Sequence, residues 1–269
     1  MNNRPVLFLD SGIGGIPYCR RFKENNPQET LCYLADRLHF PYGTRKREEL
    51  VSILATLTEK LVTTVDPKII VLACNTATVS ALAELRQSFP GLPFVGTVPA
   101  IKPAMLASKT GNIGVLGTER TIEDPYIRRL AGGACTIKGI AAPELVEFVE
   151  HRFISADEKE KSEIAREYIG RFRASGVDAV VLGCTHFLFL LEEFRKEAAP
   201  DITVFDSVDG IARRIESLLD ENKLRAEENS TPIQNKFLLT SCEPADSSWQ
   251  GWAEQLGFRL SLLDDDNGR

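Results

Sequence analysis

The sequence lacks three features that would place it in other broad classes of protein. It has no apolar run near the roughly 18–20 residues that a helix needs to span a bilayer. Its first residues, MNNRPVLFLD, are too short for the apolar core of a signal peptide, and no small-residue cleavage site follows them. It contains no CxxC pair among its six cysteines. We therefore expect a cytoplasmic protein whose cysteines are reduced thiols, because persistent disulfides are rare in the cytosol.

An excess of basic residues is also lacking. Lys and Arg number 32, Asp and Glu number 38, and the formal net charge is −6. Nucleic acid and anionic membranes attract proteins with a basic surface, so we expect neither as a partner. A small anionic ligand stays compatible with this charge, because local charge decides its binding. The chain of 269 residues, 43% hydrophobic and 26% charged, is typical of an ordered globular protein with one large or two small domains.

Short apolar runs alternate with longer amphipathic stretches, which is the pattern of an α/β fold. Several runs are apolar at consecutive positions, as in parallel strands that are covered on both faces. We predict strands at residues 6–9, 31–34, 69–72, 94–96, 113–116, 136–140, 179–182, 203–205 and 237–239. We predict helices at residues 15–25, 48–63, 76–89, 121–130, 143–150, 157–175, 188–197 and 209–221. Good capping residues stand at four of these starts: Thr76, Thr121, Asp157 and Asp209.

The chain contains an internal repeat. Residues 70–76 read IVLACNT and residues 180–186 read VVLGCTH, at an offset of 110. Residues 6–12 resemble the segment that starts at residue 113, at a similar offset of 107. Two similar offsets indicate two α/β halves related by duplication. We predict a first domain of residues 1–97 plus 207–269 and a second domain of residues 98–206.

Cys74 and Cys184 occupy equivalent places in the repeat, directly after a strand and before a helix. Ligands of open α/β sheets bind at the carboxyl ends of strands, and a helix N-terminus favours a thiolate. Buried core cysteines are the alternative. The polar residues that directly follow each cysteine favour a functional site over a place in the apolar core. A free thiol of pKa 8.5 is only about 3% ionised at pH 7, so neighbouring groups must assist it.

Two thiols facing one substrate would permit proton transfer by two bases. One thiolate removes a proton from one face of a carbon, and the other thiol protonates the opposite face, which inverts the centre. A disulfide is disfavoured in the cytosol, and Cys-Thr-His offers too few metal ligands at poor spacing. No lysine that could form a Schiff base stands at a strand end. We therefore predict no metal ligands, and the absence of such a lysine disfavours pyridoxal phosphate chemistry.

Loops after other strands supply further polar groups. Residues 10–15, DSGIGG, hold glycines that let backbone N–H groups approach an anion, although a plain tight turn is an alternative. Pro17 stands where a dinucleotide-binding loop needs its third glycine. His186 could control the protonation state of Cys184, and Asp10 could do the same for Cys74.

Three other candidates have structural alternatives. Residues 41–43, Pro-Tyr-Gly, could be only a rigid turn. Thr118 could be a helix cap, and Glu150 could be a solvated charge at a helix end.

Together these motifs resemble the glutamate racemase family, within the aspartate/glutamate racemase superfamily. The matching segments stand in the family's order: LFLDSGIGG (7–15), ADRLHFPYG (35–43), VLACNTAT (71–78), IGVLGTERTI (113–122), VVLGCTH (180–186) and FDSVDGIARR (205–214). The resemblance implies two pseudo-symmetric α/β domains with mostly parallel sheets and an active site in the cleft between them. It also implies a homodimer that interconverts L- and D-glutamate without a cofactor, supplying D-glutamate for peptidoglycan.

The resemblance assigns roles residue by residue. Cys74 and Cys184 match the two proton donor/acceptors. Asp10, Asp36, His186 and Glu150 match groups that assist them. The residues expected to contact the substrate are Asp10, Ser11, Asp36, Pro41, Tyr42, Gly43, Asn75, Thr76, Thr118, Thr185 and His186.

The chain departs from the family pattern at three places, none of which affects the thiol chemistry. Leu188 replaces a usual Pro, Val208 replaces a usual Ala, and His151 stands where an acidic residue is common. Some relatives carry an N-terminal extension for activation by a cell-wall precursor, and we expect no such control here. An aspartate or hydantoin racemase would use the same thiols. A binding protein on the same scaffold is an alternative of another class, but binding alone needs no thiols.

Overall fold

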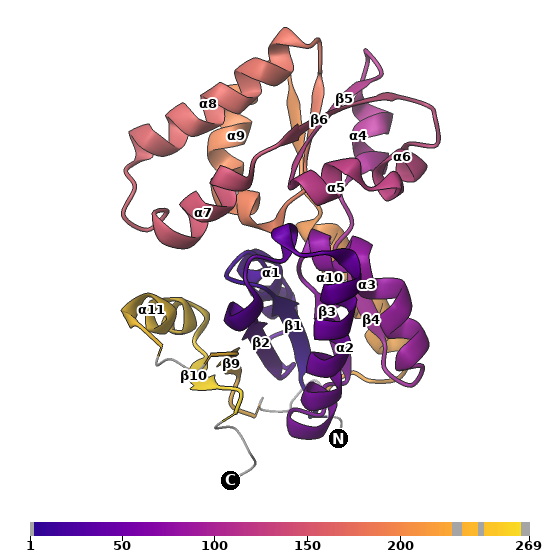
Figure 1. Ribbon diagram of the computed structural model, residues 1–269, viewed down its shortest axis with the longest axis vertical. Helices are drawn as coiled ribbons and strands as arrows, with labels where there is room; N and C mark the ends of the chain where they lie inside the picture. The colour runs from indigo at the N-terminus through magenta and orange to yellow at the C-terminus, as the bar shows by residue number, and fades with distance from the viewer. Residues whose placement is uncertain (1–2, 228–232, 242–244, 265–269) are drawn as a thin grey trace. The chain divides into compact units, whose positions relative to one another are not determined.

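A computed structural model describes residues 3–227, 233–241 and 245–264 of the chain (Figure 1). The chain divides into two compact units, residues 1–97 with 208–269 and residues 98–207. Both units contain a parallel sheet with helices between the strands, so the predicted α/β class is confirmed. None of the helices in the described ranges is long and apolar enough to cross a membrane.

The first unit is built on a six-stranded parallel sheet of order β10-β9-β2-β1-β3-β4. Its strands are β1 (Val6–Asp10), β2 (Leu31–Ala35), β3 (Ile69–Leu72), β4 (Phe94–Gly96), β9 (Lys236–Leu239) and β10 (Arg259–Leu262). Its helices are α1 (Ile16–Asn25), α2 (Arg47–Thr64), α3 (Asn75–Ser88), α10 (Val208–Glu221) and α11 (Ser247–Leu256), with 3-10 turns η1 (Arg37–His39) and η2 (Tyr42–Thr44). Helices α2 and α3 pack together, as do α1 and α10.

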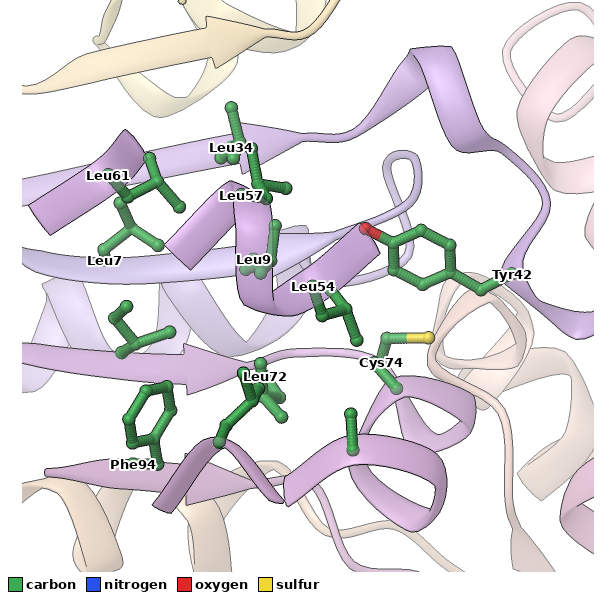
Figure 2. Packing of buried hydrophobic residues seen from close by; sticks show 14 of the residues in the cluster. Leu7, Leu9, Leu34, Tyr42, Leu54, Leu57, Leu61, Leu72, Cys74 and Phe94 are labelled. Carbon is green, nitrogen blue, oxygen red and sulfur yellow. The ribbon is translucent and has the colours of Figure 1, made fainter. Parts of the chain in front are cut away.

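Alternate side chains of β1 enter two different layers. Leu7 and Leu9 belong to an apolar cluster that includes Leu54 of α2 (Figure 2). Phe8 points to the other layer instead, where its ring centroid lies 5.9 Å from that of Phe22 on α1. Burial on both faces explains why this strand is apolar at consecutive positions. The first cluster extends to Tyr42 and Cys74, so the core directly supports residues predicted for the site.

The second unit is built on a four-stranded parallel sheet of order β6-β5-β7-β8. Its strands are β5 (Asn112–Gly117), β6 (Thr136–Ala141), β7 (Ala179–Leu182) and β8 (Thr203–Phe205). Its helices are α4 (Ile101–Ala107), α5 (Glu119–Glu123), α6 (Pro125–Ala131), α7 (Pro143–His151), α8 (Glu158–Ala174) and α9 (Leu191–Ala198), with the 3-10 helix η3 (Thr185–Leu190). Helix α4 packs with α6, and α8 packs with α9 (Figure 1).

The two units share one strand order. The order β2-β1-β3-β4 of the first unit recurs as β6-β5-β7-β8 in the second. In each unit the strand that precedes a candidate cysteine, β3 or β7, pairs in parallel with the first strand of that unit. This arrangement agrees with the repeat in the sequence and places Cys74 and Cys184 in equivalent positions.

Several predicted helix starts are wrong. Cys74, not Thr76, precedes α3, and Asp209 lies inside α10. The predicted helix at residues 121–130 is two helices, because Thr118 caps α5 and Asp124 caps α6, with Pro125 at its first position. The helix predicted from residue 188 begins at Leu191, after the 3-10 helix. Asp157 caps α8 as predicted, accepting a hydrogen bond from the N–H of Glu160.

Candidate functional site

Three neighbouring strands of the first unit end beside one another, and each leads into candidate site residues. β1 ends at Asp10, β2 leads into Asp36, and β3 leads into Cys74. Backbone hydrogen bonds tie these ends together, since the N–H of Asp36 donates to the carbonyl of Asp10 at 2.8 Å. The N–H of Ala73 donates to the carbonyl of Leu9 at 2.8 Å. This edge is the carboxyl end of the sheet, where ligands of α/β proteins bind.

The loop after β1 is fixed at both ends. The buried carboxylate of Asp10 accepts the N–H of Gly12 at 2.9 Å and the hydroxyl of Ser11 at 3.4 Å. The hydroxyl of Tyr33 donates to the carbonyl of Gly12 at 2.8 Å and accepts the N–H of Gly15 at 3.2 Å. The loop is therefore preorganised before any ligand binds.

Gly15 has no room for a side chain. An added Cβ would lie 2.6 Å from the Cβ of Ala73, the neighbour of Cys74, and 3.1 Å from the Tyr33 hydroxyl. We expect Gly15→Ala to lower the free energy of unfolding by about 1–3 kcal/mol, because overpacking forces backbone shifts. Urea denaturation measures this loss. Gly91→Ala is the control, since nothing lies within 4 Å of its added Cβ. Equal stability of the two variants would contradict the packing described here.

Asp36 organises the turns that follow β2. Its buried carboxylate accepts the hydroxyl of Tyr42 at 2.7 Å and the hydroxyl of Thr240 at 2.5 Å. Nδ1 of His39 lies 2.9 Å from both of its oxygens. Sequence reasoning missed His39 and Thr240 as parts of this network. Pro41 and Gly43, both expected to contact the substrate, flank Tyr42 and are half-buried.

Tyr42 lies beside Cys74 in the same buried cluster (Figure 2). Burial raises the pKa of the Tyr42 phenol well above its ordinary value, and the charges of Asp36, Cys74 and Asp10 raise it further. The phenol therefore stays protonated at neutral pH, with its proton directed to Asp36.

Cys74 stands at the N-cap of α3 in an extended conformation and is 7% exposed. The next two residues, Asn75 and Thr76, are also buried. Both side-chain polar atoms of Asn75 lack a hydrogen-bond partner among the described residues. A buried amide without partners is costly, so its donor and acceptor are available for a polar ligand.

Cys184 occupies the equivalent position in the second unit. It precedes η3 in an extended conformation and is 6% exposed. The N–H of Gly183 donates to the carbonyl of Leu116 at 2.6 Å, which ties the end of β7 to β5. Thr185 and His186, both predicted for the site, are buried directly after it.

A chain of polar contacts runs from Cys184 to α7. Its Sγ lies 3.8 Å from Nδ1 of His186, and Nε2 of His186 lies 2.6 Å from Oε1 of Glu150. The side chains of His186 and Glu150 are only 4% and 5% exposed. Glu150 is therefore not a solvated charge at a helix end, and it contacts the imidazole directly.

The protonation of His186 follows from these contacts. Burial acts to lower the pKa of His186, but hydrogen bonds and charge from Cys184 and Glu150 outweigh it and raise the pKa well above its ordinary value. An imidazolium is thus held between a carboxylate and a sulfur. A positive charge at this position stabilises a thiolate.

Thr118 has a structural role. Its side chain accepts the N–H of Thr121 at 3.3 Å and donates to the Thr121 hydroxyl at 3.0 Å, capping α5. His151, next to Glu150, is exposed and pairs with Glu147 instead. Within the described ranges, no three His, Cys, Asp or Glu side chains are grouped as metal ligands would be. None of the five described cysteines forms a disulfide, and Cys242 lies outside the described residues.

Comparison with known proteins agrees with this geometry. The family model described as Asp/Glu/Hydantoin racemase matches residues 20–215. The glutamate racemase of Roseiflexus sp. (strain RS-1) is 38% identical over 231 residues, covering 84% of each chain. That of Bartonella quintana is 33% identical over 267 residues, covering 97% of each.

Solved structures resemble the chain over nearly its whole length. Escherichia coli glutamate racemase, in complex with L-glutamate and the activator UDP-MurNAc-ala, gives a TM-score of 0.83 at 28% identity, covering 96% of this chain and 97% of that one. Francisella tularensis glutamate racemase, in complex with D-glutamate, gives 0.79 at 25% identity, covering 98% and 100%. Because the family model spans most of the sequence and these relatives cover most or nearly all of it, the chain belongs to the Asp/Glu/Hydantoin racemase family and is a racemase, an isomerase.

Proposed function

We propose that this racemase interconverts L- and D-glutamate without a cofactor, with Cys74 and Cys184 acting on opposite faces of the α-carbon. The observation that carries the proposal is the equivalence of the two thiols. Each follows the corresponding strand of its unit, in an extended conformation, at the start of a helical segment. The choice of glutamate is supported by relatives named glutamate racemase, some solved with L- or D-glutamate bound.

In the proposed reaction, one cysteine acts as a thiolate and removes the α-proton. The electron pair of the broken C–H bond moves into the α-carboxylate and forms a dianion. The other cysteine, a thiol, then protonates the carbon from the opposite face and becomes a thiolate. Proton and charge balance, and the reverse reaction exchanges the two roles.

The groups around the two thiols differ, although each cysteine must act as a thiolate with one enantiomer and as a thiol with the other. His186 and Glu150 would hold a positive charge beside the Cys184 thiolate. In the first unit, the carboxylate of Asp10 would instead control the protonation state of Cys74.

Hydrogen-bond donors must also stabilise the dianion, because the α-carbon is a much weaker acid than a thiol. We assign this role to the buried polar residues beside the thiols: Ser11, Asn75, Thr76 and Thr185. Asn75 suits it especially, since its amide has no partner among the described residues. Asp36 and Tyr42 would shape the surroundings of Cys74.

Chiral chromatography tests the substrate. L-glutamate, L-aspartate and a substituted hydantoin are incubated separately with reduced enzyme and no cofactor. Racemisation of glutamate alone is expected. Inversion of aspartate or the hydantoin, with glutamate unchanged, would keep the family and the thiols but overturn the proposed substrate.

Glu150→Gln tests the paired imidazolium. In the native protein His186 stays protonated until the pH rises through its raised pKa. The variant lacks the carboxylate that helps to raise this pKa, so the alkaline limb of the kcat profile should move down by about 1–3 pH units. Glu147→Gln is the control on the same helix, because Glu147 pairs with the exposed His151. An unchanged alkaline limb in Glu150→Gln would contradict the role of this contact.

We further propose that the enzyme acts in the cytoplasm as a homodimer and that its D-glutamate is used for peptidoglycan, and hence for cell shape. Reduced cysteines fit a cytosolic protein. The net charge of −6 disfavours nucleic acid as a partner. Light scattering on the purified protein tests the dimer, and a monomer mass at working concentration would overturn it.

A further inference from the structure

Thr240 is connected by hydrogen bonds to the residues around Cys74. It directly follows β9 and is buried. Its hydroxyl donates to Oδ1 of Asp36 at 2.5 Å and accepts the N–H of Leu38 at 3.2 Å. Its own N–H donates to the carbonyl of Ala35 at 3.2 Å. Both hydrogen-bonding functions of the hydroxyl are therefore used to fix the turn after β2.

Asp36 transmits this constraint to Tyr42. Its Oδ1 accepts the hydroxyl of Thr240 and its Oδ2 accepts the hydroxyl of Tyr42, while Nδ1 of His39 lies 2.9 Å from both oxygens. Hydrogen bonds to both oxygens fix the orientation of this carboxyl group. The Tyr42 hydroxyl commits its proton to Asp36 and can only accept from other groups.

Tyr42 in turn lies beside the reactive sulfur. Tyr42 and Cys74 belong to one buried cluster, and Figure 2 shows the ring next to the thiol. A ring held on one side by Asp36 has little freedom to rotate away from Cys74.

The same strand also supports the Asp10 loop. Phe237 of β9 lies 4.8 Å from the ring of Tyr33, whose hydroxyl holds Gly12 and Gly15. Trp249 of α11 packs edge-on against Phe237, with centroids 6.1 Å apart. The segment that contains β9 thus braces two loops of the site without supplying any of the predicted site residues.

We infer that Thr240 is a positioning residue for Cys74, acting through Asp36 to hold Tyr42 against the thiol. The expected change in kcat with glutamate rests on the proposed function. The expected effect of Thr240 on the reactivity of Cys74 does not depend on which substrate the enzyme uses.

Thr240→Val and Thr240→Ser test the inference. Valine keeps the shape but removes the hydroxyl, so we expect kcat with glutamate to fall about tenfold, because small misplacements of reacting groups are costly. Serine restores the hydroxyl and should recover kcat to within about twofold. Thr58→Val is the matched control, since Thr58 is a buried threonine of the same unit whose hydroxyl donates only within α2, to the carbonyl of Leu54 at 2.7 Å.

Alkylation by iodoacetamide, mapped to each cysteine by mass spectrometry, supplies a second readout. In Thr240→Val the rate at Cys74 should rise at least about threefold, since a loosened Tyr42 exposes the thiol, and the rate at Cys184 should not change. Thr240→Ala serves the same purpose if the valine variant fails to fold. Equal kcat and equal Cys74 alkylation in the Thr240 and Thr58 variants would overturn the inference. Absence of glutamate turnover in the wild type would overturn the proposed function alone.

Discussion

Replacing either Cys74 or Cys184 by alanine should abolish racemisation, with a loss in kcat of about 10³–10⁴-fold or more. Each variant keeps one thiol, which can reach only one face of the α-carbon. It can still remove the α-proton from one enantiomer and return a solvent proton to the same face. In deuterated buffer, each variant should therefore exchange the α-proton of one enantiomer without inverting it, and the two variants should prefer opposite enantiomers.

Proton NMR of L- and D-glutamate, followed separately, measures both effects. Cys135→Ala is the control, because Cys135 lies on the approach to β6 and belongs to neither thiol position. It should racemise glutamate at nearly the wild-type rate. Near-wild-type racemisation by either Cys74→Ala or Cys184→Ala would mean that one base suffices and that the equivalence of the two thiols is not functional.

Breaking the buried ion pair between Lys68 and Glu29 should cause the largest loss of stability, about 3–5 kcal/mol in the free energy of unfolding. Both side chains are fully buried, with Nζ of Lys68 2.5 Å from Oε2 of Glu29. The other oxygen of Glu29 accepts the N–H of Ala226 at 2.9 Å. Removal of either partner leaves a buried charge without compensation. Through its bond to Ala226, Glu29 also connects the residue before β3 to the segment after α10.

Glu29→Gln and Lys68→Met, unfolded in urea, test this expectation. Glu24→Gln is the control from an exposed pair with Arg21, where we expect less than about 1 kcal/mol. The double variant Glu29→Leu/Lys68→Met should recover much of the loss, because no unpaired charge remains. Lys68 precedes β3, whereas Cys74 follows it, so kcat of the folded single variants should be unchanged. A loss below about 1 kcal/mol in both single variants would show that water reaches the pair.

The strands were predictable where both faces are buried. β3 and β7 match their predicted bounds to the residue, because a continuous apolar run leaves little choice of where the strand begins and ends. β10 was not predictable in this way, since Arg259–Leu262 alternates in polarity and is half-exposed at the edge of the sheet. The short helix α4 contains Pro103, which interrupts the sequence pattern expected of a helix. α11 follows a capping residue, Asp246, and this signal could have found it.

The site was predictable where the chemistry is local in the sequence. The repeat alone places Cys74 and Cys184 at equivalent strand ends, and His186 stands two residues from its thiol. The contact between Glu150 and His186 joins residues 36 positions apart and was not predicted; family resemblance suggested only that each residue assists the thiols. The bond from Thr240 to Asp36 spans 204 positions, and no local pattern marks either residue as its partner. Such contacts depend on which strands become neighbours, which the sequence pattern leaves open.

The fate of the α-hydrogen during the first turnovers tests the two-base account most directly. Wild-type enzyme converts protiated L-glutamate in deuterated buffer, and mass spectrometry of the separated enantiomers measures deuterium before the product accumulates. With two thiols, the proton removed at one face does not reach the other, so the first D-glutamate formed should carry solvent deuterium at its α-carbon while the remaining L-glutamate stays protiated. D-glutamate that retains the substrate's own α-proton would show transfer by a single base and would contradict the roles assigned to Cys74 and Cys184.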